Sequence, residues 1–390
     1  MTSPLPAASR WTDEFLDEMR KVTDPEADAL TMEVFNSGGT DALLKLKTFY
    51  DAWDAEVPDD LPPKIKEFFE RPVPYPDWVD QDLIRHAESL FVSYGPITTV
   101  VLLLNAVPHF FTNPAGARSF YLAQIFNPDS VKSRMHEVPQ FVINITQREG
   151  LAQTPDPAAP YGFKKGPGII TAQKLRMAHA RIRILLKLRQ KDPTKNWDAQ
   201  SLGEPINQED LAEALMYFCL WTVEGLKKVG ITQESRDTDA FLMSWKTVGF
   251  LLGLREELQP ATVEEAILLR DTIARRWTYP TAEGAFLIDQ MLGIMSGMMP
   301  LGYKTLPAGL MRYQLGDEVA DVLQVPNPRA VIWILKALKP FWEQEKVFAK
   351  LAMRLSPPVV NWLVTQDRAG HRGKFFVPEE LARSWGLSSR

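Results

Sequence analysis

The spacing of apolar residues along the chain predicts helices. Between residues 169 and 190, and again between 207 and 229, apolar side chains return every three or four positions, the spacing of one helix face. No convincing run of alternating apolar and polar residues predicts a strand, and no segment repeats. We therefore expect an all-α chain, with further helices over residues 11–22, 43–53, 64–69, 80–91, 96–105, 115–126, 132–146, 238–254, 263–275, 283–298, 319–325 and 329–355.

Proline and glycine divide this pattern into parts. Residues 1–75 are acidic and rich in proline, so we expect an N-terminal helical extension there and a main domain over residues 76–390. We expect Gly95-Pro96 to break one helix and Pro139 to kink another, because proline lacks an amide hydrogen and clashes with the preceding turn. The segment 153–168, rich in proline and alanine, is expected to be a loop.

Charge and composition exclude some classes of protein. The formal net charge is −5, which does not favour a nucleic-acid-binding domain. The single cysteine, Cys219, cannot form an intramolecular disulfide or a cysteine-based zinc site. The longest apolar run, residues 97–107, is shorter than the ~20 residues of a membrane span. With no secretory signal pattern, we expect a cytoplasmic protein without a transmembrane segment; its oligomeric state stays open.

Of the five histidines, His179 is the one whose neighbours suggest a functional role. Leu175, His179, Ile182 and Leu186 form one stripe of the helix over residues 169–190, so the imidazole should face an apolar surface. One interpretation is a buried neutral histidine with a satisfied hydrogen bond. Two other histidines have different surroundings. His136 adjoins Glu137 but faces another side of its helix, and we expect His109 to pack among aromatic neighbours.

The helix that carries His179 is also strongly basic. Seven cations and no acids lie between residues 171 and 191: Lys174, Arg176, Arg181, Arg183, Lys187, Arg189 and Lys191. Such a run is often a solvated helix face. Arginines also bind carboxylates in two-point contacts, and an imidazole beside them on an apolar stripe is what an iron porphyrin needs. No CxxCH motif is present, so a haem would be held without covalent bonds.

Six segments resemble, in order, those of the latex clearing protein (rubber oxygenase) family, which includes the oxygenase of mycophenolic acid biosynthesis. LRMAHARIR at residues 175–183 resembles the family signature R-x-x-H-A-x-V-R. PINQEDLAEALMYF at 205–218 resembles P-I-N-Q-E-D-L-A-x-T-x-x-x-F. The other matching segments are LPPKIKEFF (61–69) with PDWVD (76–80), SVKSRMHEVPQFV (130–142), WKTVGFLLGL (245–254) and LPAGLMR (306–312).

The resemblance implies a fold, a cofactor and an activity. The fold would be a globin-like helical core with additional helices, and the cofactor haem b. His179 would bind the iron, Arg176 and Arg183 would belong to the cofactor site, and Arg134 would be a distal or propionate-side cation. Glu137 would be the distal acid–base group, because burial near an apolar face raises a carboxyl pKa. The enzyme would use O2 to cleave or oxygenate a C=C bond.

Two positions depart from the family pattern. Val138 and Ala214 stand where threonine is usual, so two hydroxyl groups are absent. Together with the absent secretory signal, this favours a small apolar, isoprenoid-like substrate over a polymer. It also leaves two alternatives open: a haem protein that binds without oxidising, such as a sensor or carrier, and a helical interaction protein without a cofactor.

Overall fold

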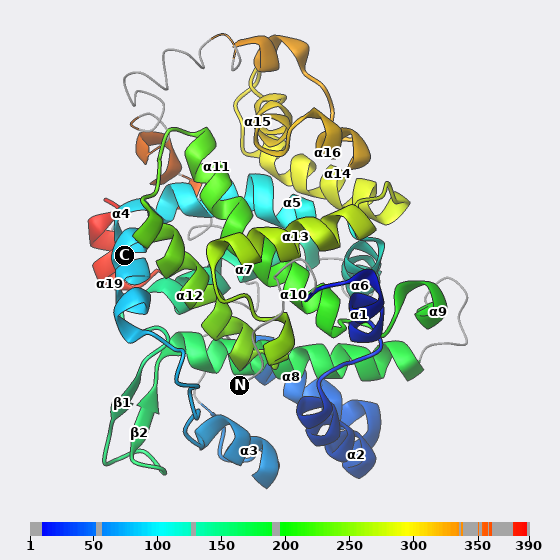
Figure 1. Ribbon diagram of the computed structural model, residues 1–390, viewed down its shortest axis with the longest axis vertical. Coiled ribbons are helices and arrows are strands. Elements are labelled where there is room, and N and C mark those ends of the chain that lie inside the picture. The colour runs from blue at the N-terminus through cyan, green and yellow to red at the C-terminus, as the bar shows by residue number, and fades with distance from the viewer. Residues whose placement is uncertain are drawn as a thin grey trace.

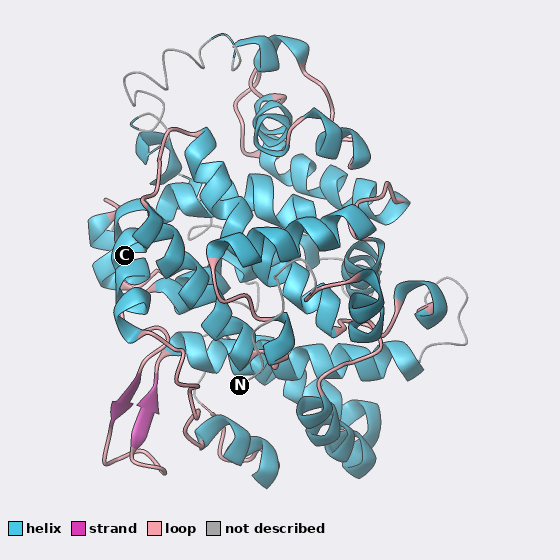
Figure 2. Cartoon of the chain, in the orientation of Figure 1, coloured by secondary structure: helices cyan, strands magenta, loops and turns pink. Residues whose placement is uncertain are grey.

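The structure is a computed structural model that describes residues 10–51, 57–125, 130–188, 196–334, 337, 350, 353–357, 359–360 and 377–387. At residues 123–125 and 130–136 it describes the backbone alone. Helices dominate these ranges, and their β structure is one short hairpin (Figure 2). The predicted all-α class is confirmed. Most of residues 329–355, one of the predicted helices, lies outside the described ranges.

The elements follow one another as labelled in Figure 1. Their bounds are α1 Asp13–Met19, α2 Pro25–Asp51, α3 Pro63–Glu70, α4 Gln81–Val101, η2 Leu102–Ala106, α5 Val107–Phe110, α6 Pro114–Ile125, α7 Ser130–Thr146, β1 Gln153–Pro155, β2 Phe163–Lys165, α8 Pro167–Leu188, α9 Ala199–Leu202, α10 Gln208–Met216, η3 Tyr217–Trp221, α11 Thr222–Lys228, α12 Ser235–Leu251, η4 Glu256–Leu258, α13 Val263–Trp277, α14 Ala282–Gly297, α15 Leu306–Leu315, α16 Asp317–Val322 and α19 Glu379–Ser384.

Two long helical segments cross the middle of the molecule (Figure 1). One runs through α4, η2 and α5, and the other through α10, η3 and α11; η2 and η3 are single wide π-helical turns that contact each other. The side chains of Asp80 and Asn207 cap the N-terminal ends of the two segments by accepting hydrogen bonds from backbone amides of the first turn. The largest apolar core lies around these segments and includes α12 and α13.

The predicted break at Gly95-Pro96 is wrong, because α4 continues through both residues. Proline cannot donate to the carbonyl four residues back, here that of Val92. The indole Nε1 of Trp385, from α19, donates to this carbonyl at 3.0 Å and takes the place of the missing amide. Gly95 leaves room for the indole, since a Cβ there would lie 2.1 Å from Trp385 Cζ2. A contact between residues 293 positions apart in the chain therefore keeps the helix whole.

The helical stretch Gln81–Phe110 is long and apolar enough to cross a membrane. However, 72% of its most apolar window is buried inside the molecule, which suits a core helix. Residues 97–107, the longest apolar run of the sequence, lie in this stretch and are nearly all buried.

The N-terminal residues pack against α8 rather than standing apart from it. Helix α2 begins well before the predicted residue 43 and contains a break at Gly39, whose φ is 63°. Its apolar side and that of α3 form a second buried cluster with Met177, Ala180 and Ile184 of α8. The predicted domain boundary at residue 75 stays a prediction, but residues on both sides of it share this cluster.

The segment 153–168, expected to be a loop, contains a β-hairpin. Strands β1 and β2 pair antiparallel, with Gln153 opposite Lys165 and Pro155 opposite Phe163. Three-residue strands are too short to show an alternating pattern, so the sequence gives no signal for them. The hairpin projects from the body beside α3 (Figure 1).

Candidate functional site

Helix α8 presents two different sides to the molecule. Met177, Ala180 and Ile184 are buried against α2 and α3, whereas Leu175, His179 and Ile182 are only half-buried. Leu175 packs against the main core, and Ile182 packs against a small cluster that includes Leu122 of α6. His179 lies between these two positions on the same stripe. The imidazole therefore sits on an apolar, partly covered strip of α8, as the spacing predicts.

A matching half-buried strip lies on α10 and η3. Ala214 and Phe218 are four residues apart and half-buried, although their neighbours Glu213, Leu215, Tyr217 and Cys219 are buried. Phe218 stacks on Trp245 of α12, with ring centroids 5.1 Å apart and an interplanar angle of 15°. This partly accessible strip is a second candidate part of the site.

Helix α7 contributes the predicted distal residues. It meets α8 at a corner where Asn144 Nδ2 donates to Thr171 Oγ1 at 2.8 Å. Glu137 lies seven residues before Asn144, and His179 lies eight residues after Thr171. At a helical rise of ~1.5 Å per residue, both are about 10 to 12 Å along their helices from this corner. Glu137 and Val138 are half-buried, and Val138 packs against the main core.

The side chain of Arg134 lies outside the described residues, as does that of His136. The structure places Arg134 on α7 by its backbone alone. Its predicted role beside Glu137 stays a prediction. The same holds for Glu137, whose position on α7 is described while its proton chemistry is not tested.

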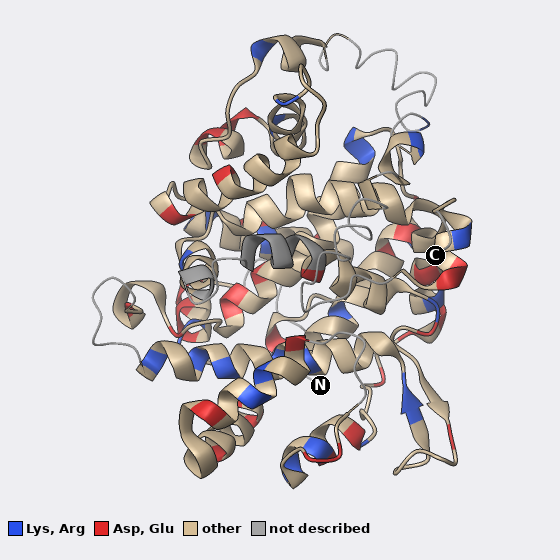
Figure 3. Cartoon of the chain, turned by 180° about the vertical axis from the view of Figure 1, so that it is seen from behind, with Lys and Arg blue, Asp and Glu red and all other residues tan. Residues whose placement is uncertain are grey.

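Arg176 and Arg183, the predicted cofactor arginines, have carboxylate partners at the start of α2. Arg176 binds both oxygens of Asp24, at 2.5 and 2.8 Å, and Glu26 at 3.0 Å. Burial by itself lowers the pKa of Arg176, but hydrogen bonds and charge from these carboxylates outweigh it and raise the pKa. Arg183 binds Asp28 at 2.6 Å. Figure 3 shows the blue positions of α8 lying above the red positions of α2.

Two of the other cations of α8 are buried. Lys174 is fully buried, with its ammonium 4.4 Å from the Phe49 ring centroid, and Arg181 is 9% exposed. Lys187 is exposed and pairs with Glu204 at 2.7 Å. Arg189 and Lys191 lie outside the described residues. The basic run is thus largely covered by the N-terminal extension, which supplies negative charge that a periodicity argument cannot assign.

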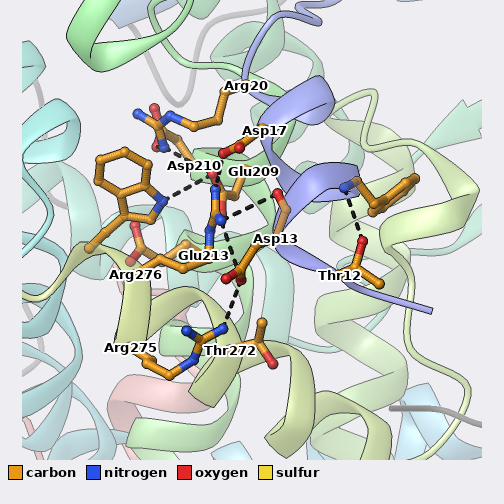
Figure 4. Close-up of polar contacts among 12 residues, drawn as sticks. Thr12, Asp13, Asp17, Arg20, Glu209, Asp210, Glu213, Thr272, Arg275 and Arg276 are labelled. Carbon is orange, nitrogen blue, oxygen red and sulfur yellow. Dashed lines mark hydrogen bonds and ion pairs between the residues drawn. The ribbon is translucent and has the colours of Figure 1, made fainter. Parts of the chain in front are cut away.

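A second charged group was missed by the sequence reasoning. Glu209, Asp210 and Glu213 of α10 are all buried, together with Arg20 and Asn113 (Figure 4). Arg20 binds Glu209 at 3.1 Å and Asp210 at 3.0 Å, and Arg276 binds Glu209 at 2.9 Å. In sequence, Glu209 and Asp210 read as an ordinary first turn of a helix. Their partners lie up to 190 residues away, so no local signal marks their burial.

Glu213 is held in its neutral form. Asn113 Nδ2 donates to Glu213 at 2.5 Å, and the Tyr217 hydroxyl donates to its other oxygen at 2.9 Å. Burial, with the nearby charge of Asp210, raises the pKa of Glu213 to about 8 in spite of these hydrogen bonds. The group around Arg20 is therefore fully partnered: Arg20 and Arg276 pair with Glu209 and Asp210, whose pKa values are raised by burial against the effect of these arginines, and Glu213 is a carboxylic acid.

Comparison with known proteins adds a family and a fold. Residues 130–342 match the family described as "ER-bound oxygenase mpaB/B'/Rubber oxygenase, catalytic domain". The chain is 25% identical over 304 residues to the rubber oxygenase of Streptomyces sp. (strain K30), covering 77% of this chain and 70% of that protein. It also resembles a solved structure of latex clearing protein in the closed state, with a TM-score of 0.66 and 22% identity over 95% of this chain and 91% of the other. The last likeness shows the fold alone.

Proposed function

Because this chain belongs to the ER-bound oxygenase mpaB/B'/Rubber oxygenase family, we propose that it is a haem b-dependent oxygenase. Its substrate would be a small, apolar, isoprenoid-like molecule in which O2 oxidises or cleaves a C=C bond. The matched residues include α7, α8 and α10, the three helices that carry the candidate site residues.

The half-buried strip of α8 is the observation that supports this proposal most. A porphyrin needs one axial ligand at the centre of an apolar slot. His179 lies between Leu175 and Ile182, whose apolar side chains are themselves only half-buried. A second apolar strip, at Ala214 and Phe218, is similarly incomplete. This donor and these walls fit a haem, with His179 as the residue that would hold its iron.

Arg176 and Arg183 fit the cofactor site less directly. Both are engaged by Asp24, Glu26 and Asp28 of α2. A haem propionate would have to share these guanidinium groups with α2 or displace its carboxylates. We therefore propose that the two arginines orient α8 through α2 and supply positive potential at the edge of the site.

The residues around His179 would serve the reaction in distinct ways. Bound haem would supply the O2 chemistry that side chains lack. Glu137, half-buried on α7, would be the acid–base group that takes up and releases a proton at its carboxyl oxygens. Val138, Ala214 and Phe218 would exclude water and contact an apolar substrate.

The first test compares absorbance spectra of the full chain expressed with a haem precursor. Wild type should show a Soret band, and His179→Ala should lose most of it. His86→Ala is a matched control, since His86 lies on α4 and pairs with Asp237 at 2.7 Å. A folded wild type without the band would refute the haem assignment. A band that survives His179→Ala would refute His179 as the ligand.

The second candidate function is that of a haem-binding carrier or sensor. It is favoured by Val138 and Ala214, which are apolar at two positions where the resembling family usually has threonine. Oxygen uptake in the presence of apolar alkenes separates the two candidates. Steady O2 consumption with formation of a carbonyl or oxygenated product supports the enzyme. A stable Soret band with no turnover over a broad alkene panel supports the carrier.

A further inference from the structure

A cluster of buried polar atoms lies where the two π-helical turns meet. It comprises Asn105 of η2, His109 of α5, Trp221 of η3, Thr222 of α11 and Gln314 of α15. Within the described part of the chain, one polar atom of each has no hydrogen-bond partner: Asn105 Oδ1, His109 Nε2, Trp221 Nε1, Thr222 Oγ1 and Gln314 Oε1.

Contacts among these residues show that they form one cluster. Asn105 Nδ2 donates to the Trp221 carbonyl at 2.7 Å, and the His109 ring stacks on the Trp221 ring at 3.9 Å. Gln314 Nε2 donates to the Gly225 carbonyl at 3.3 Å. A Cβ built on Gly225 would lie 2.8 Å from Gln314 Oε1 and 2.9 Å from Asn105 Nδ2, so both amides border the same point.

The cluster cannot satisfy itself by simple pairing. His109 Nδ1 lies 2.9 Å from the carbonyl oxygen of Asn105, which only accepts, so Nδ1 carries the ring hydrogen and Nε2 is an acceptor. The Trp221 N–H points along the plane of its ring. That ring is tilted only 14° from the imidazole stacked on it, so the N–H cannot reach His109 Nε2. Leaving such groups dry in a core is costly, and native proteins rarely do so.

We propose that this cluster is an internal water site, which hydrates the junction of η2 and η3. Three of its free atoms accept hydrogen bonds, one donates, and the Thr222 hydroxyl does both. Water molecules, each donating two hydrogens and accepting two, complement this set, and buried waters generally bind two to four polar groups. Single π-helical turns inside α-helices are frequently found at functional sites.

The electrostatic surroundings favour water over a cation. The Arg270 guanidinium lies 4.4 Å from the Trp221 ring centroid, and the positive charges of Arg270 and Lys228 also act on His109. Burial, with these two charges adding to it, lowers the pKa of His109 to about 3, so the ring is neutral. A metal ion or ammonium would meet the same positive field. A neutral molecule that donates hydrogen bonds meets no such penalty.

The Thr222→Val substitution tests the proposal by the sign of its effect, because it removes the hydroxyl and keeps the shape. If water binds the hydroxyl, the variant loses a hydrogen bond and its Tm should fall by about 2 °C. If the hydroxyl is buried and dry, removing it relieves a desolvation penalty and the Tm should rise or stay unchanged. The latter result would overturn the proposal.

Thr247→Val is the matched control, because the buried Thr247 hydroxyl donates to the Met243 carbonyl at 2.8 Å. Its Tm should fall in either case, which shows that the assay detects a lost hydrogen bond. A high-resolution crystal structure of the full chain gives an independent answer. We expect ordered water within hydrogen-bond distance of His109 Nε2, and a dry, fully packed cluster would refute the site.

Discussion

The buried charges around Arg20 and the half-buried strip around His179 are two unlike ways to place polar groups in a helical core. Around Arg20, each charged side chain has partners, and Glu213 is kept neutral by burial. Around His179, the flanking residues are apolar and incompletely covered. We call the first the complete region, because its charged groups are partnered within the protein, and the second the incomplete region, because its apolar side chains are only partly covered. The difference indicates that unusual charge marks the scaffold here, and incomplete burial marks the candidate site.

The largest effect should come from breaking the complete region with Arg20→Met. Glu209 and Asp210 would be left buried with less compensating charge, which costs about 3 to 5 kcal/mol when a buried ion pair loses one partner. Urea unfolding of the cofactor-free chain measures this loss. The variant that remains folded should still bind haem. A loss below about 1 kcal/mol, or a lost Soret band with stability intact, would break the distinction between the two regions.

Because Glu213 is protonated in the folded protein, the free energy of unfolding should depend on pH. Its folded-state pKa of about 8 lies above the ordinary value of 4.5, so the folded protein holds a proton that the unfolded chain releases. The stabilisation is therefore fully present below pH 4.5 and is lost as the pH rises toward 8. Across this window the free energy of unfolding should fall by up to about 1.4 kcal/mol per pH unit.

Glu213→Gln should remove this slope, because glutamine stays neutral and keeps the size of the side chain. The measurement is the difference between wild type and variant in urea unfolding at several pH values from 4.5 to 8. A difference that stays constant over the window would show that Glu213 is ionised in the folded protein.

In the incomplete region, a substitution should change the stability of the cofactor-free chain little and the stabilisation by haem strongly. In the cofactor-free chain, His179→Ala removes a half-buried side chain and should lower the free energy of unfolding by less than about 1 kcal/mol. Haem at about 100 times its Kd should stabilise wild type by about 2.7 kcal/mol and leave the variant nearly unchanged. A large loss without haem would assign His179 to the scaffold instead.

The two regions also differ in how far the sequence foretells them. The His179 strip is visible because helix periodicity places Leu175, His179 and Ile182 on one face, and periodicity is a local property. The Arg20 group is invisible, because Glu209 and Asp210 gain their partners from α1 and α13, far along the chain. The continuous α4 is unpredictable for the same reason, since Trp385 supplies the hydrogen bond that Pro96 removes.

The basic run of α8 shows the limit of reading charge locally. Seven cations without an acid suggest either a solvated face or an anion site. In the structure, Arg176 and Arg183 bind carboxylates at the start of α2. These carboxylates belong to the N-terminal extension and lie about 150 residues earlier in the chain. Fold class and the candidate ligand could thus be predicted from short-range patterns, whereas the partners of charged groups depend on packing between distant segments.

The smallest effect is expected for Ala→Thr at position 214, which can be compared with the same change at position 212 of the same helix. Ala214 and Ala212 both lie on α10, but Ala214 is half-buried and Ala212 is fully buried. Ala→Thr adds the same β-branched side chain at either position, so the intrinsic helix penalty cancels between them. Ala212→Thr should overpack the core and cost about 1 to 3 kcal/mol, whereas Ala214→Thr should cost less than about 1 kcal/mol because its side chain extends into space. Equal losses would mean that the strip of Ala214 and Phe218 lines no space.

The absorbance of the haem-loaded variants tests whether this space lies beside the cofactor. If it does, Ala214→Thr should be tolerated and should shift the spectrum, whereas any folded Ala212→Thr should leave the spectrum unchanged.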